Sequence, residues 1–348
     1  MKLVELQKKL KEQKVTQMIV SSKARIHYLI DRSFDCGERM IALLVKQDKA
    51  YLFLNELFPC SPIEGVEIIN FNDCDRPVEL LNDYLDEGKC GVDSEYRAVF
   101  LLQLLKMHSE IEDLSDLIDE MQAIKNAEEI VKMRQASLYN DEVMNRVRGL
   151  IHVGISEIEL ANQIHDLFVE VSGGGESFET IVAFGEHGAD PHCVPGERRL
   201  KEKECIIIDM GCKCEGYCSD MTRTFFVNEN NMKEIYDCVK RANLAAKAVI
   251  KPGVKFSDID RAAREVIENA GHGKAFFHRL GHGIGLSVHE PYDVSGSNDR
   301  FVQEGMCFSI EPGIYYPEIG GVRLEDLVVV TKDGCEVLNH ASLDDEVI

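Results

Sequence analysis

The sequence predicts an α+β protein with two domains, a smaller mixed α/β domain over residues 1–122 and a larger domain over residues 123–348. Three observations support this division. Strand and helix patterns alternate along the first part of the chain, Asn126 and Glu129 can form a capping box that starts a new helix, and one sequence pattern of the second part recurs further on. We therefore expect a single sheet in the first domain and two related halves in the second.

The first domain is expected to hold a sheet of about five strands, which is typical of a small domain. Short apolar, β-branched runs indicate the strands, and apolar residues at helical spacing indicate two helices. The expected helices span 3–10 and 78–85, and the expected strands span 17–20, 41–45, 50–54, 66–71 and 90–92. None of these segments carries a chemical motif of its own, so the chemistry is expected in the second domain.

The second domain contains an internal repeat, because the segments 154–161 and 253–262 match in their glycine, serine and acidic positions. In each copy a serine, Ser156 or Ser257, is the predicted N-cap of a helix, with an acidic residue three positions later. Two copies are too few for a stacked solenoid. The repeat instead favours two pseudo-symmetric halves.

The stretch 205–227 is typical of a β-hairpin with an aspartate on each arm. Its first arm is apolar and β-branched, as a buried strand should be, and ends at Asp209, while the return arm carries Asp220 near its start. Gly211 and Gly216 supply the conformational freedom that the turn needs. A buried carboxylate is costly unless a cation meets it, so two that face each other indicate a metal site.

Three further residues are candidate ligands for the same metal. His282 lies in a glycine-rich segment that lets the backbone approach closely, Glu311 follows an apolar strand as Asp209 does, and Glu325 stands just before the apolar run 327–330. Four carboxylates and one imidazole form a hard, oxygen-rich set of ligands. Such a set suits two Mn²⁺-like ions better than a cysteine-ligated structural zinc.

On these residues the chain resembles the metal-dependent Xaa-Pro peptidases, aminopeptidase P and prolidase, which share the pita-bread fold with methionine aminopeptidase. The resemblance implies a catalytic domain of two pseudo-symmetric αβ halves around a curved antiparallel sheet. It also implies a creatinase-like N-terminal domain that shapes the substrate entrance and the dimer contact. The similar segments are SFETIVAFG (177–185), PHCVPGERRL (191–200), IIIDMG (206–211), YCSDMTRTF (217–225), HRLGHGIGLSVHE (278–290) and SIEPGIYYPEIGGVRLED (309–326).

The resemblance also implies a role for each candidate metal ligand. Asp209 would bind the first ion, and Asp220 and Glu325 would bridge the two ions. His282 and Glu311 would complete the ligands of the second ion. The ions are expected to be Mn²⁺, with Co²⁺ or Zn²⁺ as alternatives. They would hold a bridging hydroxide that attacks the peptide carbonyl, with Glu311 taking the proton of the bridging water.

Three more residues are implied to act on the substrate. His289 contacts the carbonyl group, His192 lies on the opposite wall, and Arg323 steadies the proton network or the substrate backbone. The family usually has glycine after the first histidine, where this chain has Cys193. A thiol at this position would narrow the pocket or bind a softer ion.

The resemblance implies cleavage before proline, whose nitrogen has no N–H for a peptidase to bind. A metal-activated hydroxide with histidine donors does not depend on that hydrogen. The site must still hold the pyrrolidine ring against an apolar wall. The candidates for this wall are Phe178, Phe184, His192 and Tyr316.

The expected function is that of an Xaa-Pro aminopeptidase, which releases the first residue from peptides with proline second. The alternative is a prolidase restricted to dipeptides, for which the sequence identifies no group that would hold the free carboxylate. Methionine aminopeptidase is disfavoured because its family lacks the extra N-terminal domain. A binding module without catalysis is disfavoured because all five ligand positions are filled.

Composition excludes several kinds of partner and compartment. The net charge of -22 and the pI near 4.9 argue against nucleic acids and anionic membranes, which need a basic surface. No stretch approaches the ~20 apolar residues of a membrane span, and the N-terminus lacks the apolar core of a signal peptide. The 12 cysteines are therefore expected to be reduced in the cytoplasm. The resemblance favours a homodimer.

Cys212, Cys214 and Cys218 crowd the predicted hairpin turn. No fourth soft ligand stands nearby, and their spacing is not that of a zinc knuckle. We expect solvent-facing thiols here rather than a metal site.

Overall fold

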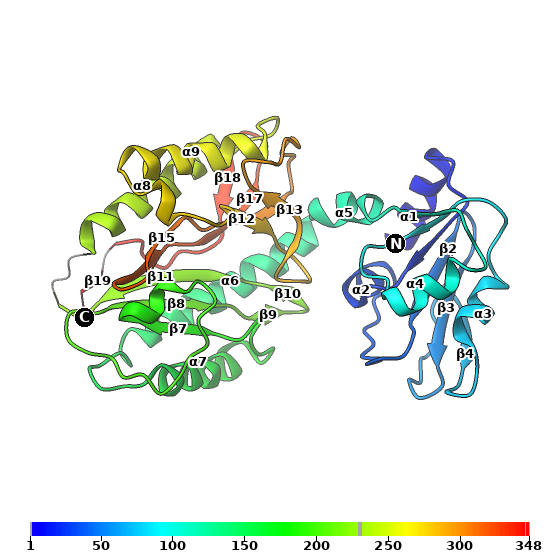
Figure 1. Ribbon diagram of the computed structural model, residues 1–348, viewed down its shortest axis with the longest axis horizontal. Coiled ribbons are helices and arrows are strands. Elements are labelled where there is room, and N and C mark those ends of the chain that lie inside the picture. Colours follow the sequence, from blue (N-terminus) through cyan, green and yellow to red (C-terminus); the bar gives the residue numbers. More distant parts are fainter. Residues whose placement is uncertain (1, 229–231, 345, 348) are drawn as a thin grey trace. The chain divides into compact units, whose positions relative to one another are not determined.

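The computed structural model describes residues 2–228, 232–344 and 346–347. The chain forms two compact units, Met1–Met121 and Gln122–Ile348. Each unit has its own sheets and its own buried core, and Figure 1 labels their elements. No helix within the described ranges is long and apolar enough to cross a membrane.

The first unit is built on one mixed sheet of six strands in the order β4-β3-β2-β1-β5-β6. The pairs β1/β2 and β2/β3 are antiparallel, and the other three pairs are parallel. The strands are β1 (Gln17–Val20), β2 (Ala42–Lys46), β3 (Ala50–Asn55), β4 (Glu67–Phe71), β5 (Cys90–Val92) and β6 (Ile111–Asp113). The helices are α1 (Lys2–Glu12), α2 (Lys23–Ile30), α3 (Pro77–Asn82), α4 (Ala98–Leu104) and α5 (Asp116–Ala123), the last of which carries the chain across the boundary.

The five predicted strands of this unit are present within one residue at each end, but the sheet has a sixth strand, β6. β6 reads Ile-Glu-Asp and pairs on one side only, with β5. Edge strands tolerate charged side chains, so this segment lacks the apolar pattern by which a strand is recognised. The helices α2, α4 and α5 were likewise not predicted, and α3 ends three residues before the predicted end at 85.

The second unit repeats one order of elements, a pair of helices followed by a largely antiparallel sheet. Helices α6 and α7 precede the sheet β19-β11-β8-β7, and α8 and α9 precede the sheet β13-β12-β14-β17-β18. Figure 1 shows the sheets between the two helix pairs. This arrangement confirms the predicted α+β fold with two pseudo-symmetric halves.

The bounds of these elements show how the sheets are connected along the chain. The helices are α6 (Ala127–Val147), α7 (Glu157–Ser172), α8 (Lys233–Val249) and α9 (Phe256–Asn269), with short 3₁₀ turns η1 (Gly185–Ala189) and η2 (Gly273–Ala275). The strands of the first half are β7 (Ile181–Phe184), β8 (Cys205–Met210), β9 (Lys213–Cys214), β10 (Tyr217–Cys218) and β11 (Met221–Phe226). Those of the second half are β12 (Gly281–Gly283), β13 (Glu290–Val294), β14 (Cys307–Ile310), β15 (Gly313–Tyr316), β16 (Gly320–Arg323), β17 (Asp326–Val330) and β18 (Cys335–Val337), and β19 (Glu346–Val347) returns to the first sheet.

Two of the three predicted helix caps are present. The side chains of Asn126 and Ser156 each accept a hydrogen bond from the backbone N–H of the glutamate three positions later. The carboxylate of that glutamate accepts the backbone N–H of the cap residue, so both form complete capping boxes. The prediction for Ser257 is wrong, because α9 begins two residues earlier than predicted, with Lys255 as its N-cap. The Ser257 hydroxyl donates instead to Asp299, 2.9 Å away in a loop that the local sequence pattern does not reveal.

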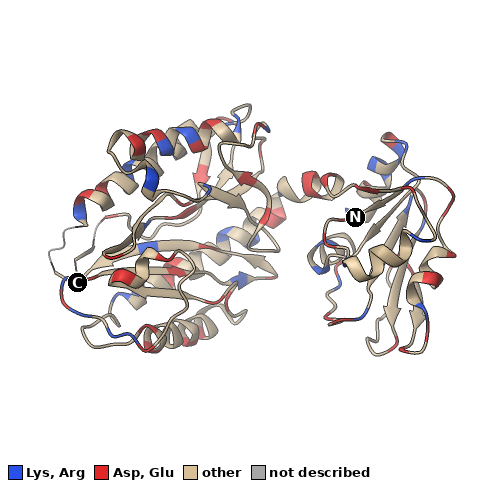
Figure 2. Cartoon of the chain, viewed as in Figure 1, with Lys and Arg blue, Asp and Glu red and all other residues tan. Residues whose placement is uncertain are grey.

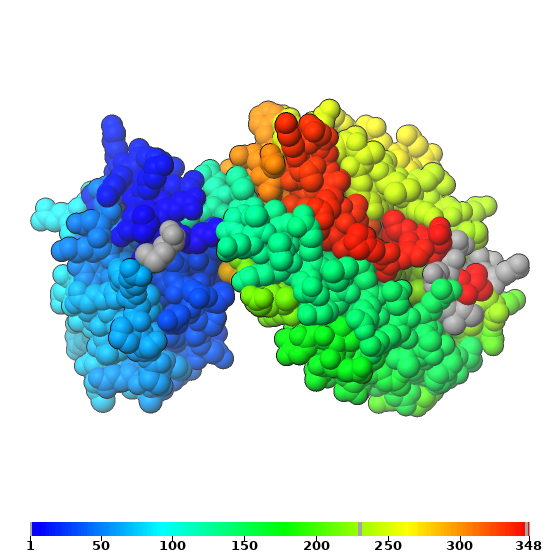
Figure 3. All heavy atoms as spheres, turned by 180° about the vertical axis from the view of Figure 1, so that it is seen from behind, coloured from blue at the N-terminus to red at the C-terminus, as the bar shows by residue number. Residues whose placement is uncertain are grey.

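The C-terminal segment packs along α6, as the adjoining colours in Figure 3 show. Arg134 donates to both carboxylate oxygens of Glu336 at 2.7 Å, and Asp141 accepts the backbone N–H groups of His340 and Ala341. These contacts join the end of the chain to the first half of the unit. Elsewhere, Figure 2 shows aspartates and glutamates spread over the helices and loops of each unit, in keeping with the net charge of -22.

Replacing Ser156 with alanine should lower the free energy of unfolding by about 1 kcal/mol, because the N-terminus of α7 loses its side-chain acceptor. Ser257→Ala is the matched control and should cost less, since Ser257 caps no helix. Denaturant unfolding followed by circular dichroism measures both values. Equal losses would contradict the assignment of the two helix starts.

Candidate active site

The predicted hairpin is formed by β8 and β11, and it brings both aspartates to one end of the first sheet. Asp209 lies opposite Thr222 in this antiparallel pair, and Asp220 stands immediately before β11. A side chain at Gly211 would place its Cβ 2.1 Å from the Ser219 carbonyl oxygen, so only glycine permits the two arms to approach here. The close approach is what holds the two carboxylates near each other.

The second sheet supplies the other three predicted ligands from the ends of neighbouring strands. His282 lies in β12, Glu311 follows β14, and Glu325 precedes β17. Ser309 connects two of them, because its hydroxyl accepts the His282 N–H and donates to Glu311 Oε1, each at 3.0 Å. The Thr222 hydroxyl of the first sheet donates to Glu325 Oε2 at 2.7 Å and so ties the two sheets together at the cluster.

The five predicted ligands converge on a small buried region. His282 Nε2 lies 3.4 Å from Glu311 Oε1 and 3.7 Å from Asp220 Oδ2, and one ligand atom each of Asp220, His282 and Glu325 falls within 4.8 Å of the others. One oxygen of each of three carboxylates is buried without a hydrogen-bond partner: Asp209 Oδ1, Asp220 Oδ1 and Glu325 Oε1. Such unpaired buried oxygens are costly unless another group binds them.

The carboxylates also raise one another's proton affinity. Burial and the charges of Glu325 and Asp209 raise the pKa of Asp220 well above its usual value, and burial with Glu311 and Asp209 does the same to the pKa of Glu325. Burial raises the pKa of Glu311 to about 7, although Arg323 opposes the shift. Without a compensating cation this region therefore favours protonated carboxyl groups.

His282 is prepared to act as a neutral ligand. Burial lowers its pKa to about 4, so the imidazole carries no charge at neutral pH. Its Nδ1 lies 3.1 Å from the Gly283 carbonyl oxygen, and a proton on Nδ1 leaves the Nε2 lone pair directed at Asp220 and Glu311. Unpaired carboxylate oxygens and a neutral imidazole nitrogen together fit hard divalent metal ions.

Arg323 places a permanent positive charge beside the cluster. Its guanidinium donates to Asp209 Oδ2 at 2.7 Å, to the Thr222 hydroxyl at 3.1 Å and to the Tyr315 hydroxyl at 3.0 Å. The side chain is almost fully buried. It therefore holds Asp209 in a fixed orientation and offsets part of the negative charge.

A cavity of about 640 Å³ opens onto this cluster. His289 packs edge-on against His282, with ring centroids 4.3 Å apart, and burial lowers the pKa of His289 to about 4. His192 lies on the segment before Cys193 and is exposed. All eight residues predicted for the site line this one cavity: His192, Asp209, Asp220, His282, His289, Glu311, Arg323 and Glu325.

Two of the four residues predicted for the proline wall line the cavity. Phe178 and His192 line the cavity, but Phe184 is fully buried in the core, because strand alternation directs it to the face of β7 opposite Ile181. Tyr316 points elsewhere and bonds His272 at 2.7 Å. The sequence reasoning missed three residues that line the cavity, Phe277, His278 and Arg279, which directly precede the glycine-rich segment of His282.

The prediction that the three turn cysteines face solvent is wrong for Cys212 and Cys218. Cys212 and Cys218 are fully buried, and Cys214 is half-buried. Their thiols contact backbone carbonyls of packed elements, Ala136 for Cys212 and Leu286 for Cys218. Among the described residues these cysteines form no group with metal-ligand spacing.

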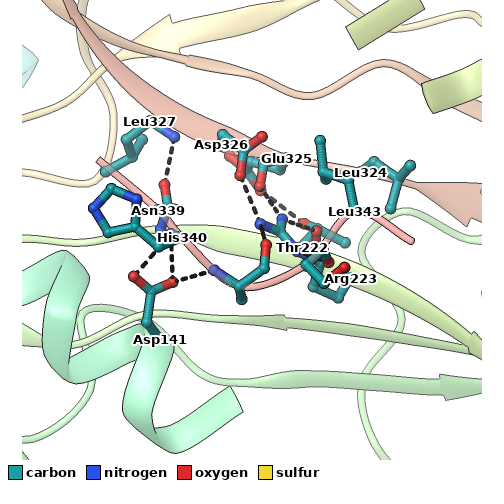
Figure 4. Close-up of polar contacts among 12 residues, drawn as sticks. Asp141, Thr222, Arg223, Leu324, Glu325, Asp326, Leu327, Asn339, His340 and Leu343 are labelled. Carbon is teal, nitrogen blue, oxygen red and sulfur yellow. Dashed lines mark hydrogen bonds and ion pairs between the residues drawn. The ribbon is translucent and has the colours of Figure 1, made fainter. Parts of the chain in front are cut away.

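A buried ionic network fixes the strand that carries Glu325 (Figure 4). Arg223 donates to the Glu325 carbonyl oxygen at 2.6 Å and to Asp326 Oδ1 at 2.7 Å, and Lys247 binds the other oxygen of Asp326 at 2.5 Å. Asn339 accepts the Leu327 N–H at 2.6 Å, as Figure 4 shows. Glu325 is therefore held from both its side chain and its backbone.

Two buried asparagines fix the strand ends in the same way in both halves. Asn140 of α6 donates to the Met210 carbonyl oxygen next to Asp209, at 2.8 Å. Asn243 of α8 donates to the Ile310 carbonyl oxygen next to Glu311, at 3.0 Å. Each half thus uses an asparagine of its first helix to position a predicted ligand.

The loop that bears His289 is held by an ion pair between Lys125 and Glu290, 2.9 Å apart and almost fully buried. The other oxygen of Glu290 accepts the N–H groups of Leu286 and Ser287. Breaking such a pair by removing one partner would leave an uncompensated buried charge. The pair therefore fixes the backbone on both sides of His289.

Comparison with known proteins gives two family matches. Residues 131–332 match the model of metallopeptidase family M24, and residues 2–124 match the creatinase/prolidase N-terminal domain. An uncharacterized peptidase of Staphylococcus aureus (strain USA300) is 37% identical over 331 residues, which cover 92% of this chain and 93% of that protein.

Solved structures of peptidases resemble the whole chain. The dipeptidase of Pyrococcus horikoshii OT3 has a TM-score of 0.92 at 34% identity and covers 100% of both chains. The Xaa-Pro dipeptidase of Bacillus anthracis has a TM-score of 0.90 at 27% identity, covering 100% of this chain and 99% of that one. The X-Pro aminopeptidase of Thermotoga maritima MSB8 has a TM-score of 0.82 at 25% identity, covering 98% and 100%.

Metal removal should destabilise the wild-type protein and leave Asp220→Asn almost unchanged. A ligand at a hundred times its dissociation constant stabilises by about 2.7 kcal/mol, which corresponds to a shift in Tm of roughly 5 to 10 °C for a unit of this size. The asparagine variant should bind the ions poorly and should not gain this stability, and its metal-free form should resemble the metal-free wild type, in which burial favours the neutral Asp220 carboxyl group.

Thermal unfolding with Mn²⁺ and with a chelator measures the difference. Glu179→Gln, which removes a carboxylate from the same cavity wall but not from the cluster, is the matched control and should respond to the chelator as the wild type does. An equal response of Asp220→Asn and wild type would contradict the predicted ligand role.

Proposed function

Because the chain belongs to metallopeptidase family M24 and carries a creatinase N-terminal domain, we propose that it hydrolyses the bond between a first residue and a following proline in small peptides. One observation carries the proposal: all eight residues expected for such a site line a single cavity. The family match makes the chain a metal-dependent exopeptidase, and the proposal adds its substrate and its residues.

We infer two divalent metal ions, with Mn²⁺ as the preferred ion. The ligands would be Asp209, Asp220, His282, Glu311 and Glu325. Their unpaired oxygens and the neutral imidazole support this inference. When bound, such ions supply an activated water and polarise the scissile carbonyl group.

The residues of the chain would then bind, orient and move protons. Glu311, whose Oε1 lies 3.4 Å from His282 Nε2 in the cluster, would accept the proton of the attacking water. His289 and His192 line the cavity, which supports hydrogen bonding to the substrate carbonyl and to the leaving nitrogen. Arg323 would keep Asp209 in its binding orientation.

A proline ring in the second position is suited to an apolar wall that needs no N–H from the substrate. Phe178, Ile181, Val288 and Phe277 line the cavity, and Phe277 is 63% exposed. We propose that this surface holds the pyrrolidine ring. An exposed aromatic side chain at a cavity mouth gains most when a ligand covers it.

Of the two candidate activities, we now favour the dipeptidase over the aminopeptidase that the sequence suggested. A dipeptidase must bind the free carboxylate of its substrate, and Arg279 lines the cavity with a guanidinium suited to that task. Its pair with Asp293 is partly exposed on both sides, so a substrate carboxylate can compete for it. The dipeptidases of Pyrococcus horikoshii and Bacillus anthracis add support.

The aminopeptidase remains the second candidate because of the size of the cavity. At about 640 Å³ it lies in the middle of the range for sites that bind drug-sized ligands, roughly 300 to 1,000 Å³, so a longer peptide would fit. The X-Pro aminopeptidase of Thermotoga maritima shares the fold over nearly the whole chain.

We also propose that the protein is a homodimer in the cytoplasm. The boundary between its domains is proposed to lie between residues 122 and 123, and the N-terminal domain is proposed to shape the substrate entrance. All 12 cysteines are free, which is the state expected in a reducing compartment. Size-exclusion chromatography with light scattering tests the dimer, and a monomer at micromolar concentration would refute it.

Metal-stripped protein refilled with Mn²⁺ should cleave Ala-Pro to alanine and proline and leave Ala-Pro-Ala and Ala-Ala intact. Chromatography of the products measures this, and Glu325→Gln should lose almost all activity because a predicted ligand is gone. Release of alanine from Ala-Pro-Ala would establish the aminopeptidase instead. Failure to cleave any of these peptides would refute both activities and favour a peptide-binding module.

Arg279→Met should raise KM for Ala-Pro by roughly 10- to 100-fold, because a hydrogen-bonded charge pair contributes about 1.5 to 3 kcal/mol. Any slow turnover of Ala-Pro-amide, which has no carboxylate, should change little. Arg261→Met removes the same charge from the exposed face of α9 and is the matched control. Equal losses with both substrates would show that Arg279 does not bind the substrate carboxylate.

A further inference from the structure

A second group of ligand-type side chains lies apart from the carboxylate cluster and reaches the wall of the cavity through one member, Cys193. It consists of Glu157, His187 and Cys193, which share none of the residues proposed to bind the catalytic ions. One ligand atom of each lies within 4.8 Å of the others. The three residues come from the start of α7, from η1 and from the segment that follows η1.

Glu157 is fully buried and held rigidly. Its Oε1 accepts the Phe184 N–H at 2.9 Å, and its Oε2 accepts the Gly196 N–H at 3.2 Å. Each carboxylate oxygen has a second lone pair, and His187 is the side chain that approaches both oxygens. Backbone N–H groups that orient a carboxylate in this way are typical of the shell around a metal ligand.

His187 approaches this carboxylate from the solvent side. Its Nδ1 lies 3.0 Å from Glu157 Oε1 and 3.1 Å from Oε2, and its side chain is 43% exposed. The imidazole is therefore placed between the buried carboxylate and water. An ion from solution could reach the group at this side.

Cys193 completes the group from the cavity wall. It is 8% exposed, and burial followed by the charges of Glu157 and Asp190 raises the pKa of its thiol to about 11. The free thiol is therefore protonated at neutral pH. A bound metal ion would displace that proton, because coordinated thiols are deprotonated.

We propose that Glu157, His187 and Cys193 form a second metal site, which binds a borderline-soft divalent ion such as Zn²⁺. Ligand atoms around a tetrahedral zinc stand about 3.3 to 3.8 Å apart. This spacing lies between the 3.0 Å that separates His187 Nδ1 from Glu157 Oε1 and the 4.8 Å that bounds the whole group. Water from the exposed side of His187 would fill the fourth position. On binding, the S–H bond breaks, a zinc–sulfur bond forms and the proton passes to solvent.

The donor set separates this site from the carboxylate cluster by its chemistry. Thiolate sulfur selects Zn²⁺, Co²⁺ and similar ions, whereas Mn²⁺ prefers carboxylate oxygens. An ion bound here would tie the segment that carries His192 to the start of α7. The inference needs no particular peptidase activity, since it depends only on these three residues.

Titration of the metal-stripped, full-length protein with Co²⁺ tests the site by absorption. A thiolate-to-cobalt charge-transfer band should appear in the near ultraviolet, and Zn²⁺ should abolish it. The band should be absent in Cys193→Ser, and in His187→Gln the affinity for Co²⁺ should fall at least tenfold. Cys214→Ser removes a half-buried thiol outside the group and is the matched control, which should keep the band.

Asp220→Asn should also keep the band, because the carboxylate cluster is a different site. A band that survives in Cys193→Ser, or no band in the folded wild type, would overturn the proposal. Circular dichroism of each variant excludes loss of folding as the cause. Since absorption does not require turnover, an inactive protein with the band would refute the proposed function and leave this site standing.

Discussion

The mutual repulsion of four carboxylates buried at one point is the constraint on which the second unit depends. Burial and neighbouring charges raise the proton affinity of Asp220 and Glu325 far above normal, and three oxygens have no hydrogen-bond partner. Such a region must either take up protons or bind cations, because several charged carboxylates are costly to bury together. Arg323 supplies one positive charge, which is too little for the whole cluster. A bound cation would therefore add stability to this arrangement, which is the physical basis for proposing the cluster as a metal site.

The scaffold resists this repulsion by fixing backbone as well as side chains. Asn140 and Asn243 anchor the strand ends beside Asp209 and Glu311 from equivalent helices of the two halves. On the opposite side, Arg223 binds the Glu325 carbonyl oxygen. A buried Arg–Asp–Lys network is a weak source of stability, because desolvation offsets much of its Coulomb energy. The network contributes more by fixing the position of Glu325, since a shift of this residue would break several charged hydrogen bonds at once.

The role of a residue can be predicted from the sequence when it depends on a local pattern. It cannot be predicted in this way when it depends on contacts with distant segments of the chain. Asp209 and Glu311 are recognisable because each ends an apolar strand, and the capping box at Ser156 lies within one helical turn. Ser257 fits the same local pattern but binds Asp299, a residue that local rules do not consider. Phe184 was misplaced because alternation along β7 can be read in two registers until the buried face is known. The polar supports of the site are contributed by residues far apart in sequence, so no spacing rule could find them.

The two donor sets, which meet the same cavity at Cys193, impose different demands on metal ions. The carboxylate cluster offers oxygen and one nitrogen, and its excess negative charge favours any divalent ion of suitable size. The group at Cys193 offers sulfur, nitrogen and oxygen, and its buried thiol must lose a proton before it binds. A soft ion forms a strong bond to sulfur, which offsets the free-energy cost of deprotonating the thiol, whereas the bond from Mn²⁺ to sulfur offsets little of it. Selectivity between the two sites therefore follows from one thiol, placed where it can bind an ion without displacing any carboxylate of the cluster.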